Sequence, residues 1–131
     1  MCKARAAAGS DARMSGCPLP VVICSGSGNQ GLTVSMPIVT AAEQLGKSQE
    51  ELYRALAFGN LLTLYIKSGI GKLSAYCGVV SAGVAAVAFL KGDSQQIIED
   101  TVSNGLANTS GIVCEGMKQT DVVILNEMLK H

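Results

Sequence analysis

The side chains best suited to chemistry gather in one short stretch, Cys24-Ser25-Gly26-Ser27-Gly28-Asn29-Gln30-Gly31. Glycine at positions 26 and 28 lets the backbone adopt positive φ and approach a ligand closely. The apolar run that follows is typical of a helix, and a helix N-terminus offers unpaired N–H groups and a positive dipole end to an anion. A carboxylate or phosphate could bind there, with the Cys24 thiol as a soft metal ligand beside it. The stretch lacks the Walker A lysine and the dinucleotide glycine spacing, so a tight connector without function is the alternative.

The chain has five cysteines, and three of them lie beside glycine or at a break: Cys24, Cys77 and Cys114. Their odd number and wide spacing argue against a disulfide framework and favour a reducing cytosol, so we expect a cytoplasmic protein. A free cysteine is commonly a small buried apolar residue. The single histidine is the last residue, His131. This excludes nucleophile systems that need a histidine and metal sites that are rich in histidine. Three thiolates in such a chain favour a soft metal or an iron–sulfur cluster, and three ligands on four irons leave one iron open as a Lewis acid.

Composition limits the partners of this chain. The length of 131 residues predicts one domain. Only 15% of the residues are charged and 48% are hydrophobic, so much of the surface is expected to be apolar and to be covered by another element. Oligomerisation, a larger parent protein or a membrane could cover it, and we expect a homo-oligomer. Zero net charge, no basic run and no tryptophan argue against nucleic-acid binding.

The apolar spacing predicts helices along nearly the whole chain. Residues 1–9 are expected to form a flexible terminus, and residues 10–131 a single helical catalytic-type domain. A first helix is expected from about Gly31 to Leu45, kinked or divided at Pro37. A capping box at Ser48-Gln49-Glu50-Glu51 predicts a second helix that reaches Lys67. Val21-Val22-Ile23 is expected to be extended, as a short strand or a loop.

The run from Leu73 to Leu90 carries no charge and is rich in glycine, alanine and serine. It is short and small for a membrane span, so a central helix buried on all sides fits it better. Two further helices are expected after Asp93-Ser94 and after Thr120-Asp121. The predicted fold is therefore all-α: a compact helical domain around a central buried helix of small residues, with the glycine-rich turn at a helix N-terminus.

Three segments together resemble one enzyme family: Cys24 to Gly31, the run Gly71-Lys-Leu-Ser-Ala-Tyr-Cys-Gly-Val-Val-Ser-Ala-Gly83, and Ser110-Gly-Ile-Val-Cys114. They are similar to the catalytic region of L-cysteine desulfidases and of the alpha chain of iron–sulfur L-serine dehydratases, from about Ser10 to the C-terminus. The resemblance implies an all-helical domain, an oxygen-sensitive [4Fe–4S] cluster and β-elimination from a small L-amino acid. The products would be pyruvate, ammonia and either sulfide or water.

By this resemblance, the metal ligands would be Cys77 and Cys114, with Cys24 in place of a further cysteine that the family has and this chain lacks. The family's motif at Cys114 continues differently, which indicates a shortened chain. The segment that would hold the substrate carboxylate comprises Ser25, Gly26, Ser27, Gly28, Asn29 and Gln30. Asp11 and Arg13 are candidates for a substrate-binding pair, although a helix cap and a surface charge would explain them more simply.

Several alternatives remain open at the level of sequence. The base that removes the α-proton could be Lys67, Lys72, Glu115 or a thiolate, and both lysines could equally be solvated residues at a helix end. Pyridoxal phosphate could support the same reaction, but no paired lysine and phosphate loop is evident. A catalytically inactive relative that serves as a helical oligomerisation domain is the rival hypothesis, and a small membrane protein built on Leu73–Leu90 is the third.

Overall fold

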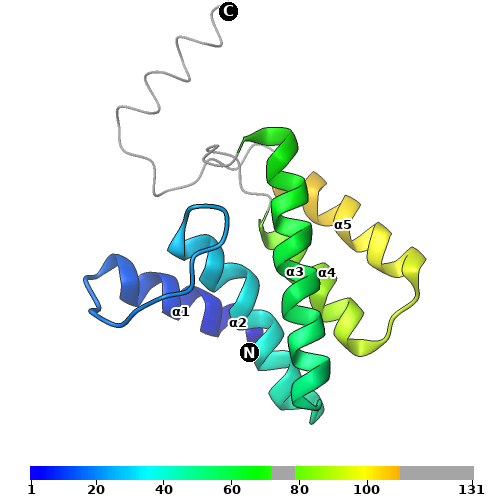
Figure 1. Cartoon of the computed structure of the whole chain (residues 1–131), viewed down its shortest axis with the longest axis horizontal. Coiled ribbons are helices and arrows are strands. Elements are labelled where there is room, and N and C mark those ends of the chain that lie inside the picture. Colours follow the sequence, from blue (N-terminus) through cyan, green and yellow to red (C-terminus); the bar gives the residue numbers. More distant parts are fainter. Residues whose placement is uncertain (72–78, 110–131) are drawn as a thin grey trace, which may run out of the picture.

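The computed structural model describes residues 1–71 and 79–109 of the chain. Within these ranges it contains five helices, α1 (Cys2–Met14), α2 (Gly28–Leu45), α3 (Gln49–Ile70), α4 (Val79–Lys91) and α5 (Gln95–Thr109), and no named strand (Figure 1). The prediction of an all-α fold is confirmed.

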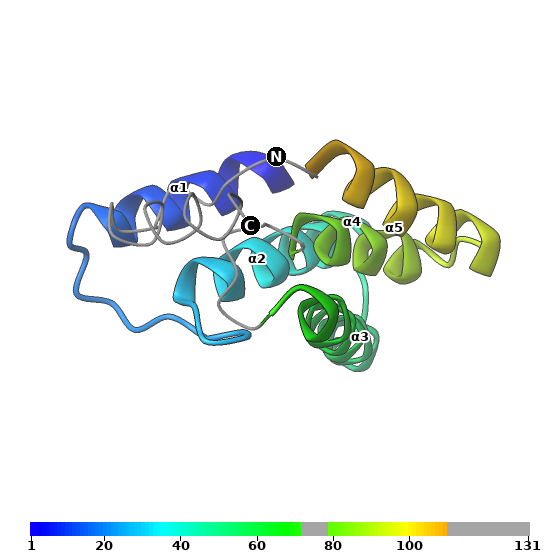
Figure 2. The same cartoon turned by 90° about the horizontal axis from the view of Figure 1, so that it is seen from above.

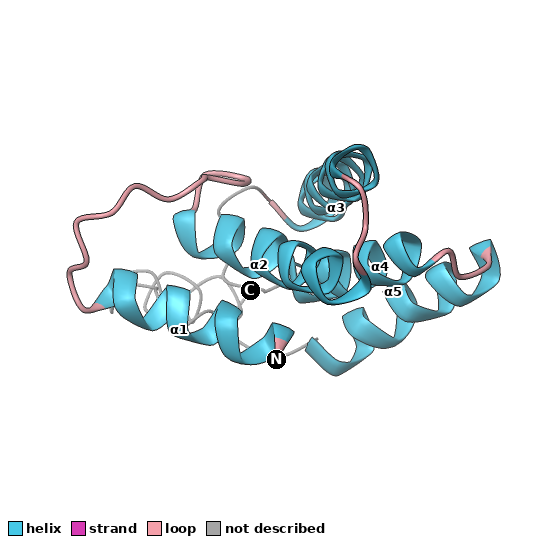
Figure 3. Ribbon diagram, turned by 90° about the horizontal axis from the view of Figure 1, so that it is seen from below, coloured by secondary structure: helices cyan, strands magenta, loops and turns pink. Residues whose placement is uncertain are grey.

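The helices lie in three layers around α4. Figure 2 shows α1 and α5 on one side of the molecule, α2 and α4 in the middle, and α3 on the other side, and the view from below in Figure 3 agrees. Helix α4 packs against α2, α3 and α5, whereas α1 packs against α2. The predicted central helix of small residues is thus found as α4, although residues 73–78 of the predicted run lie outside the described residues. It is not buried on all sides, because Val80 and Val84 are 38% and 51% exposed.

The core is built from small side chains that let the helices approach closely. In α4, Ala82, Ala85 and Ala86 have no exposed surface. A Cβ atom added to Gly59 of α3 would lie 3.0 Å from the Cβ of Ala86 and 2.9 Å from Ile38 Cδ1. Larger side chains close the ends of this core, where Phe58 of α3 stacks on Phe89 of α4 with ring centroids 4.9 Å apart.

Proline in α2 contributes to this close packing. Pro37 lies inside the helix and has no N–H to donate to the carbonyl of Thr33, four residues earlier. That carbonyl faces α4, because a Cβ atom added to Gly83 would lie 3.2 Å from it. The helix continues to Leu45 without division. The backbone hydrogen bond that Pro37 cannot make is therefore missing where α2 crosses α4.

The N-terminus differs from the sequence-based expectation. Residues 2–9, which were expected to form a flexible terminus, belong to helix α1. Two physical reasons account for the difference: the segment contains the strong helix former alanine at positions 4, 6, 7 and 8, and Arg5 pairs with Glu43 of α2. Packing of α1 on α2 therefore stabilises a segment that has no buried residue of its own.

The predicted boundaries of the next two helices hold with small shifts. The capping box is confirmed: the Ser48 hydroxyl accepts from the Glu51 N–H at 3.3 Å, and the Glu51 carboxylate accepts from the Ser48 N–H at 2.9 Å. Helix α3 runs three residues beyond Lys67 and ends at Ile70, and Gly71 follows with a φ of 93°. Among the described helices, none is both long and apolar enough to cross a membrane.

Candidate functional site

The glycine-rich stretch forms a tight turn. Cys24 and Ser27 face each other in an isolated antiparallel bridge, with Cys24 N donating to Ser27 O at 3.2 Å and Ser27 N donating to Cys24 O at 3.1 Å. The two central residues both have positive φ, 50° at Ser25 and 84° at Gly26, as in a type I′ turn. Glycine avoids the steric cost of that conformation at position 26, and a short polar residue tolerates it at position 25. Val21-Val22-Ile23, which lead into the turn, are not part of a strand.

Helix α2 begins directly after this turn, as predicted, but at Gly28 rather than near Gly31. Ser27 is its N-cap, and the Ser27 hydroxyl accepts from the Gln30 N–H at 3.5 Å. The first helical backbone bond runs from Gly31 N to Ser27 O. The N–H groups of Gly28 and Asn29 have no carbonyl partner within the helix, so they form the positive end of its dipole.

A cation lies against this helix start. Arg13, near the end of α1, donates from Nη1 to Asn29 Oδ1 at 2.9 Å. A Cβ atom on Gly28 would come within 2.8 Å of Arg13 Nε and 2.6 Å of Val21 Cγ2, so only glycine leaves room for the guanidinium there. Arg13 is exposed, and its charge adds to the positive potential of the α2 N-terminus. The arrangement can bind an anion that approaches from solvent.

The predicted partner of Arg13 is not part of this arrangement. Asp11 is exposed, and residues two apart in a helix point to nearly opposite sides. The structure therefore brings Arg13, but not Asp11, to the turn.

The Cys24 thiol lies on the inner side of the turn. Its residue is 4% exposed, and its thiol makes a side-chain hydrogen bond with Thr63 of α3. Burial raises the pKa of the Cys24 thiol, and the Thr63 hydrogen bond lowers it by less. The thiol is therefore held in its neutral form more strongly than an exposed cysteine.

Lys67 is the largest fully buried side chain among the described residues, with 1% exposure. It stands one helical turn after Thr63, so the two residues share a face of α3. Ala55, Gly59, Thr63 and Lys67, each four residues from the next, are all buried, which makes this face the inner side of α3. A lysine in this position is unusual, because lysine is almost never fully buried.

A second buried polar group lies in the first turn of α2. The Oε1 atom of Gln30 is inaccessible to solvent and has no hydrogen-bond partner within the described part of the chain. An unpaired buried carbonyl oxygen is costly and can be satisfied by a donor from a ligand.

The structure brings together some of the predicted site residues. Cys24, Ser25, Gly26, Ser27, Gly28, Asn29 and Gln30 form the turn and helix start, and Arg13 joins them. Lys72, Cys77 and Cys114 lie outside the described residues. Across residues 1–71 and 79–109, no group of three or more His, Cys, Asp or Glu side chains could hold a metal ion. This part of the chain supplies one of the three predicted thiolates and does not by itself form a cluster site.

Sequence reasoning missed Thr63, which links α3 to the turn. Leu62 and Ile66, the large apolar residues next to it on the same helix, are only partly buried. Thr63 could have been found from the sequence because it lies four residues from Gly59 and four from Lys67. That spacing places all three residues on one face of the helix, with the polar residues Thr63 and Lys67 at core positions.

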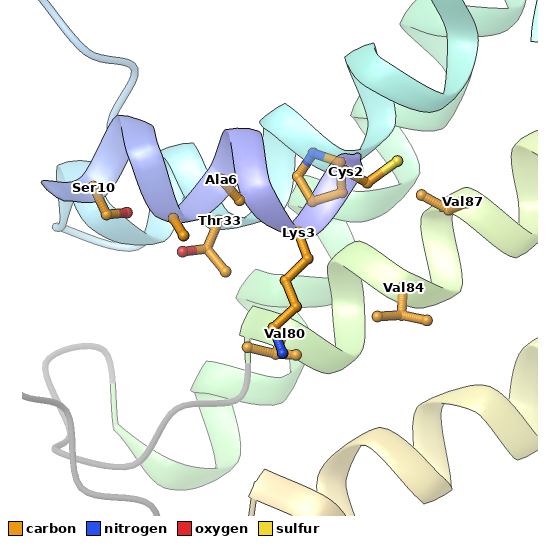
Figure 4. Close-up of a pocket in the computed structure, with 10 residues that line it drawn as sticks. Cys2, Lys3, Ala6, Ser10, Thr33, Val80, Val84 and Val87 are labelled. Atoms are coloured by element: carbon orange, nitrogen blue, oxygen red, sulfur yellow. The ribbon is translucent and has the colours of Figure 1, made fainter. Parts of the chain in front are cut away.

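A separate apolar groove lies away from this turn. It encloses about 510 Å³ between α1, α2 and α4. Figure 4 shows the valines of α4 along one wall and Lys3 of α1 reaching toward Val80. The groove is lined by Cys2, Lys3, Ala6, Ala7, Ser10, Thr33, Pro37, Val80, Val84 and Val87.

The described residues form a helical domain in which α2 begins directly after the glycine-rich turn, with Arg13 beside its first residues. Comparison with known proteins places that domain in a family: residues 1–121 match the serine dehydratase alpha chain family, and this chain belongs to it. The match begins at residue 1, so it includes α1 in addition to the region from Ser10 in which the motifs were recognised.

Curated relatives match nearly the whole chain. A UPF0597 protein of Desulfitobacterium hafniense (strain Y51) is 56% identical over 119 residues, which are 88% of this chain and 28% of the relative. A UPF0597 protein of Lachnoclostridium phytofermentans is 53% identical over 121 residues, or 90% of this chain and 29% of the relative. The chain thus spans less than a third of the length of these relatives. No solved structure matches it.

Proposed function

We propose that this chain binds the carboxylate of a small L-amino acid at the start of α2 and serves β-elimination from it, with L-serine or L-cysteine as substrate. The observation that carries the proposal is the Arg13 guanidinium packed against Gly28 at the α2 N-terminus. Membership of the serine dehydratase alpha chain family supports a dehydratase-like lyase reaction.

The electrostatics of the helix start favour a carboxylate. A cation beside the positive end of a helix is unfavourable by itself, because the dipole favours negative charge there. A carboxylate between the Arg13 guanidinium and the N–H groups of Gly28 and Asn29 would be attracted both to the guanidinium and to the positive end of the helix dipole. These two attractions would replace the repulsion between the guanidinium and the dipole. Charge-assisted hydrogen bonds of this kind contribute about 1.5–3 kcal/mol each.

The remaining residues of the site have distinct proposed roles. Gln30 Oε1 is an acceptor in the same helical turn and suits the α-ammonium group of an amino acid. Lys67 is the candidate within the described residues for the base that removes the α-proton. The β-substituent then leaves with the electron pair of its bond to carbon, as hydrosulfide from cysteine or as hydroxide from serine, which takes up a proton to become water. The unsaturated amino acid that remains hydrolyses to pyruvate and ammonia.

We propose that this chain contributes cysteine thiolates to an iron–sulfur cluster. Members of this family generally depend on an iron–sulfur cluster. The thiolates available to one in this chain are Cys24 in the turn and, outside the described residues, Cys77 and Cys114. Lys72, the other proposed base, also lies outside them.

Ligand binding tests the carboxylate site without requiring turnover. We expect L-serine and L-cysteine to raise the midpoint of thermal unfolding of the native protein, and ethanolamine, which lacks the carboxylate, to leave it unchanged. Arg13→Ala should weaken binding about 10- to 100-fold, since it removes one charge-assisted contact. Arg5→Ala, an exposed arginine of the same helix that pairs with Glu43, is the matched control and should bind normally. Equal binding by Arg13→Ala, or equal binding of ethanolamine, would refute the site.

Anaerobic reconstitution with iron and sulfide tests the cofactor proposal. The native protein should gain broad visible absorbance and release pyruvate from L-cysteine or L-serine. Cys24→Ser should lose the absorbance, whereas Cys17→Ser, at an exposed cysteine outside the turn, should keep it. A colourless native protein, or a Cys24→Ser variant as strongly coloured as the native protein, would exclude Cys24 as a ligand.

A catalytically inactive oligomerisation domain is the second candidate function. The observation that favours it is the number of large apolar side chains that α3 exposes, among them Tyr53, Leu61 and Tyr65. A folded, colourless protein that forms no pyruvate and binds no amino acid would support it.

A further inference from the structure

The apolar groove between α1, α2 and α4 interrupts one layer of the molecule. Figure 2 shows α1 and α5 on the same side of α2 and α4. Within the described part of the chain these two outer helices do not contact each other. The groove next to α1 is lined on α4 by Val80 and Val84, which are 38% and 51% exposed. The described helices therefore leave an apolar part of α4 uncovered.

The two outer helices are poorly buried for their length. Helix α1 has 13 residues, none of them buried, and α5 has 15 residues, of which Thr109 at its end is buried. Helices this short are marginal in water without tertiary packing on an apolar face. The groove side of α1 carries small side chains, Ala6, Ala7 and Ser10, which allow another helix to approach closely. An apolar helix in the groove would supply the missing packing.

The chain leaves α5 at one end of this groove. Ser81 Oγ donates to Val102 O at 2.8 Å, and a Cβ atom added to Gly105 would lie 2.9 Å from Ser81 Cα. The last turns of α5 thus lie against the first turn of α4. Val80, the neighbour of Ser81, lines the groove. Residue 110 therefore follows α5 close to the end of the groove at which Val80 lies.

The C-terminal segment has an apolar side that suits the groove. Residues 110–131 lie outside the described residues, and the sequence predicts a helix after Thr120-Asp121. In that helix Val122, Leu125 and Leu129 recur at spacings of three and four and share one side. Asn126 lies on the other side, where it would remain in solvent.

The length of the segment also fits. A helix over residues 121–130 would be about 15 Å long, whereas Val80 and Val87, the first and last groove residues of α4, are separated by about 10 Å along the helix. Residues 110–120 can span up to about 35 Å when extended. The segment can therefore reach the whole groove from the end of α5.

We propose that residues 121–130 dock in this groove as a helix of the same chain, between α1 and α5. The apolar side of the helix then contacts Val80, Val84 and Val87, and its outer side completes the layer that α1 and α5 begin. Lys3, which Figure 4 shows reaching toward Val80, lies at the edge of the docked helix. The proposal does not depend on the proposed function.

Three native cysteines report on the groove in the full chain. Cys2 lines the groove, Cys17 is exposed, and Cys24 is buried under the turn. Leu125→Asp places a carboxylate in an apolar contact, so it should release the helix and speed alkylation of Cys2 at least about tenfold. Asn126→Asp is the matched control, with the same new charge on the opposite side, and should leave the rate of Cys2 unchanged.

The other two cysteines make the result specific. Cys17 should react at one rate in all three proteins, and Cys24 should stay slow in all of them, which shows that the turn and the core remain folded. The proposal is overturned by a native protein in which Cys2 reacts as fast as Cys17, because the groove is then open. Equal Cys2 rates in the native protein and in Leu125→Asp would overturn it as well.

Photo-cross-linking tests the occupant without disturbing the C-terminal segment. A benzophenone side chain in place of Lys3 should capture the peptide of residues 121–130 in a product with the mass of one chain. The same side chain in place of Ala8, which is exposed and does not line the groove, is the control and should not capture it. Equal capture from both positions, or none from position 3, would contradict the docking. A product with the mass of two chains would assign the groove to a second copy and refute the proposal.

Discussion

Substitution of Gly31 by alanine is the sharpest test of how the turn is held. The Cα of Gly31 lies directly against the segment that leads into the turn: an added Cβ would be 1.8 Å from Val22 O, 2.7 Å from Val22 C and 3.3 Å from Cys24 N. All three atoms belong to the backbone, so no side chain can rotate away. The chain from Val22 to Cys24 must move as a unit.

The expected cost follows from two opposing contributions. Insertion of a methyl group into a packed site costs about 1–3 kcal/mol, and a backbone clash this close belongs at the upper end. Alanine regains up to about 1 kcal/mol of helix propensity over glycine. The net loss in the free energy of unfolding is therefore about 2 kcal/mol. For a chain of this length, that corresponds to a lowering of the thermal midpoint by about 8 °C.

Thermal unfolding followed by circular dichroism measures this change. Gly69→Ala in α3 is the control, since no atom lies within 4 Å of its added Cβ, and it should be neutral or slightly stabilising. Alkylation of Cys24, located by peptide mass spectrometry, should become faster in Gly31→Ala because the displaced turn exposes the thiol. A Gly31→Ala protein with unchanged stability and unchanged Cys24 alkylation would refute the proposed contact between Val22 and α2.

Other expectations concern the caps and the buried thiol. Ser48→Ala should lower the free energy of unfolding by about 1 kcal/mol in denaturant titration, and an unchanged midpoint would contradict the capping role. The pKa of Glu51 is lowered from 4.5 to about 2, first by the backbone N–H of Ser48 and then by Lys47 and the Ser48 hydroxyl, so its contribution is present above pH 4.5 and is lost as the pH falls toward 2. Glu51→Gln should remove that part of the acid dependence of stability. Thr63→Val should raise the pKa of Cys24 further and slow its alkylation at pH 8, whereas a faster reaction would show that Thr63 shields the thiol rather than lowering its pKa.

Local signals in the sequence were sufficient for the helix starts. Ser48 and Glu51 form a capping box because both partners lie within one turn of the same helix. The glycine-rich turn was likewise predictable as a helix N-terminus, since glycine and serine have positional preferences that depend on the backbone alone. Its first helical residue was misplaced by three, because Ser27, rather than a later residue, is the cap.

Contacts between distant segments were not predictable from one sequence. The link between Cys24 and Thr63 joins residues 39 positions apart, counted as 63 − 24. The helix at residues 2–9 depends on α2, and the inner position of Lys67 depends on how α3 is rotated against α4. Helical spacing identified α3 as a helix but not which of its two apolar faces is inside.

The small side chains at the crossing of α3 and α4 also constrain how this sequence can diverge. Gly59 and Ala86 are already at the limit of approach, and Ile38 lies as close to Gly59, so Gly59 cannot gain a methyl group unless both facing side chains give way. A loss on one side alone would leave a void that the rigid helices cannot close. Gly59, Ala86 and Ile38 therefore constrain one another, and a larger residue at position 59 requires smaller residues at both of the other positions.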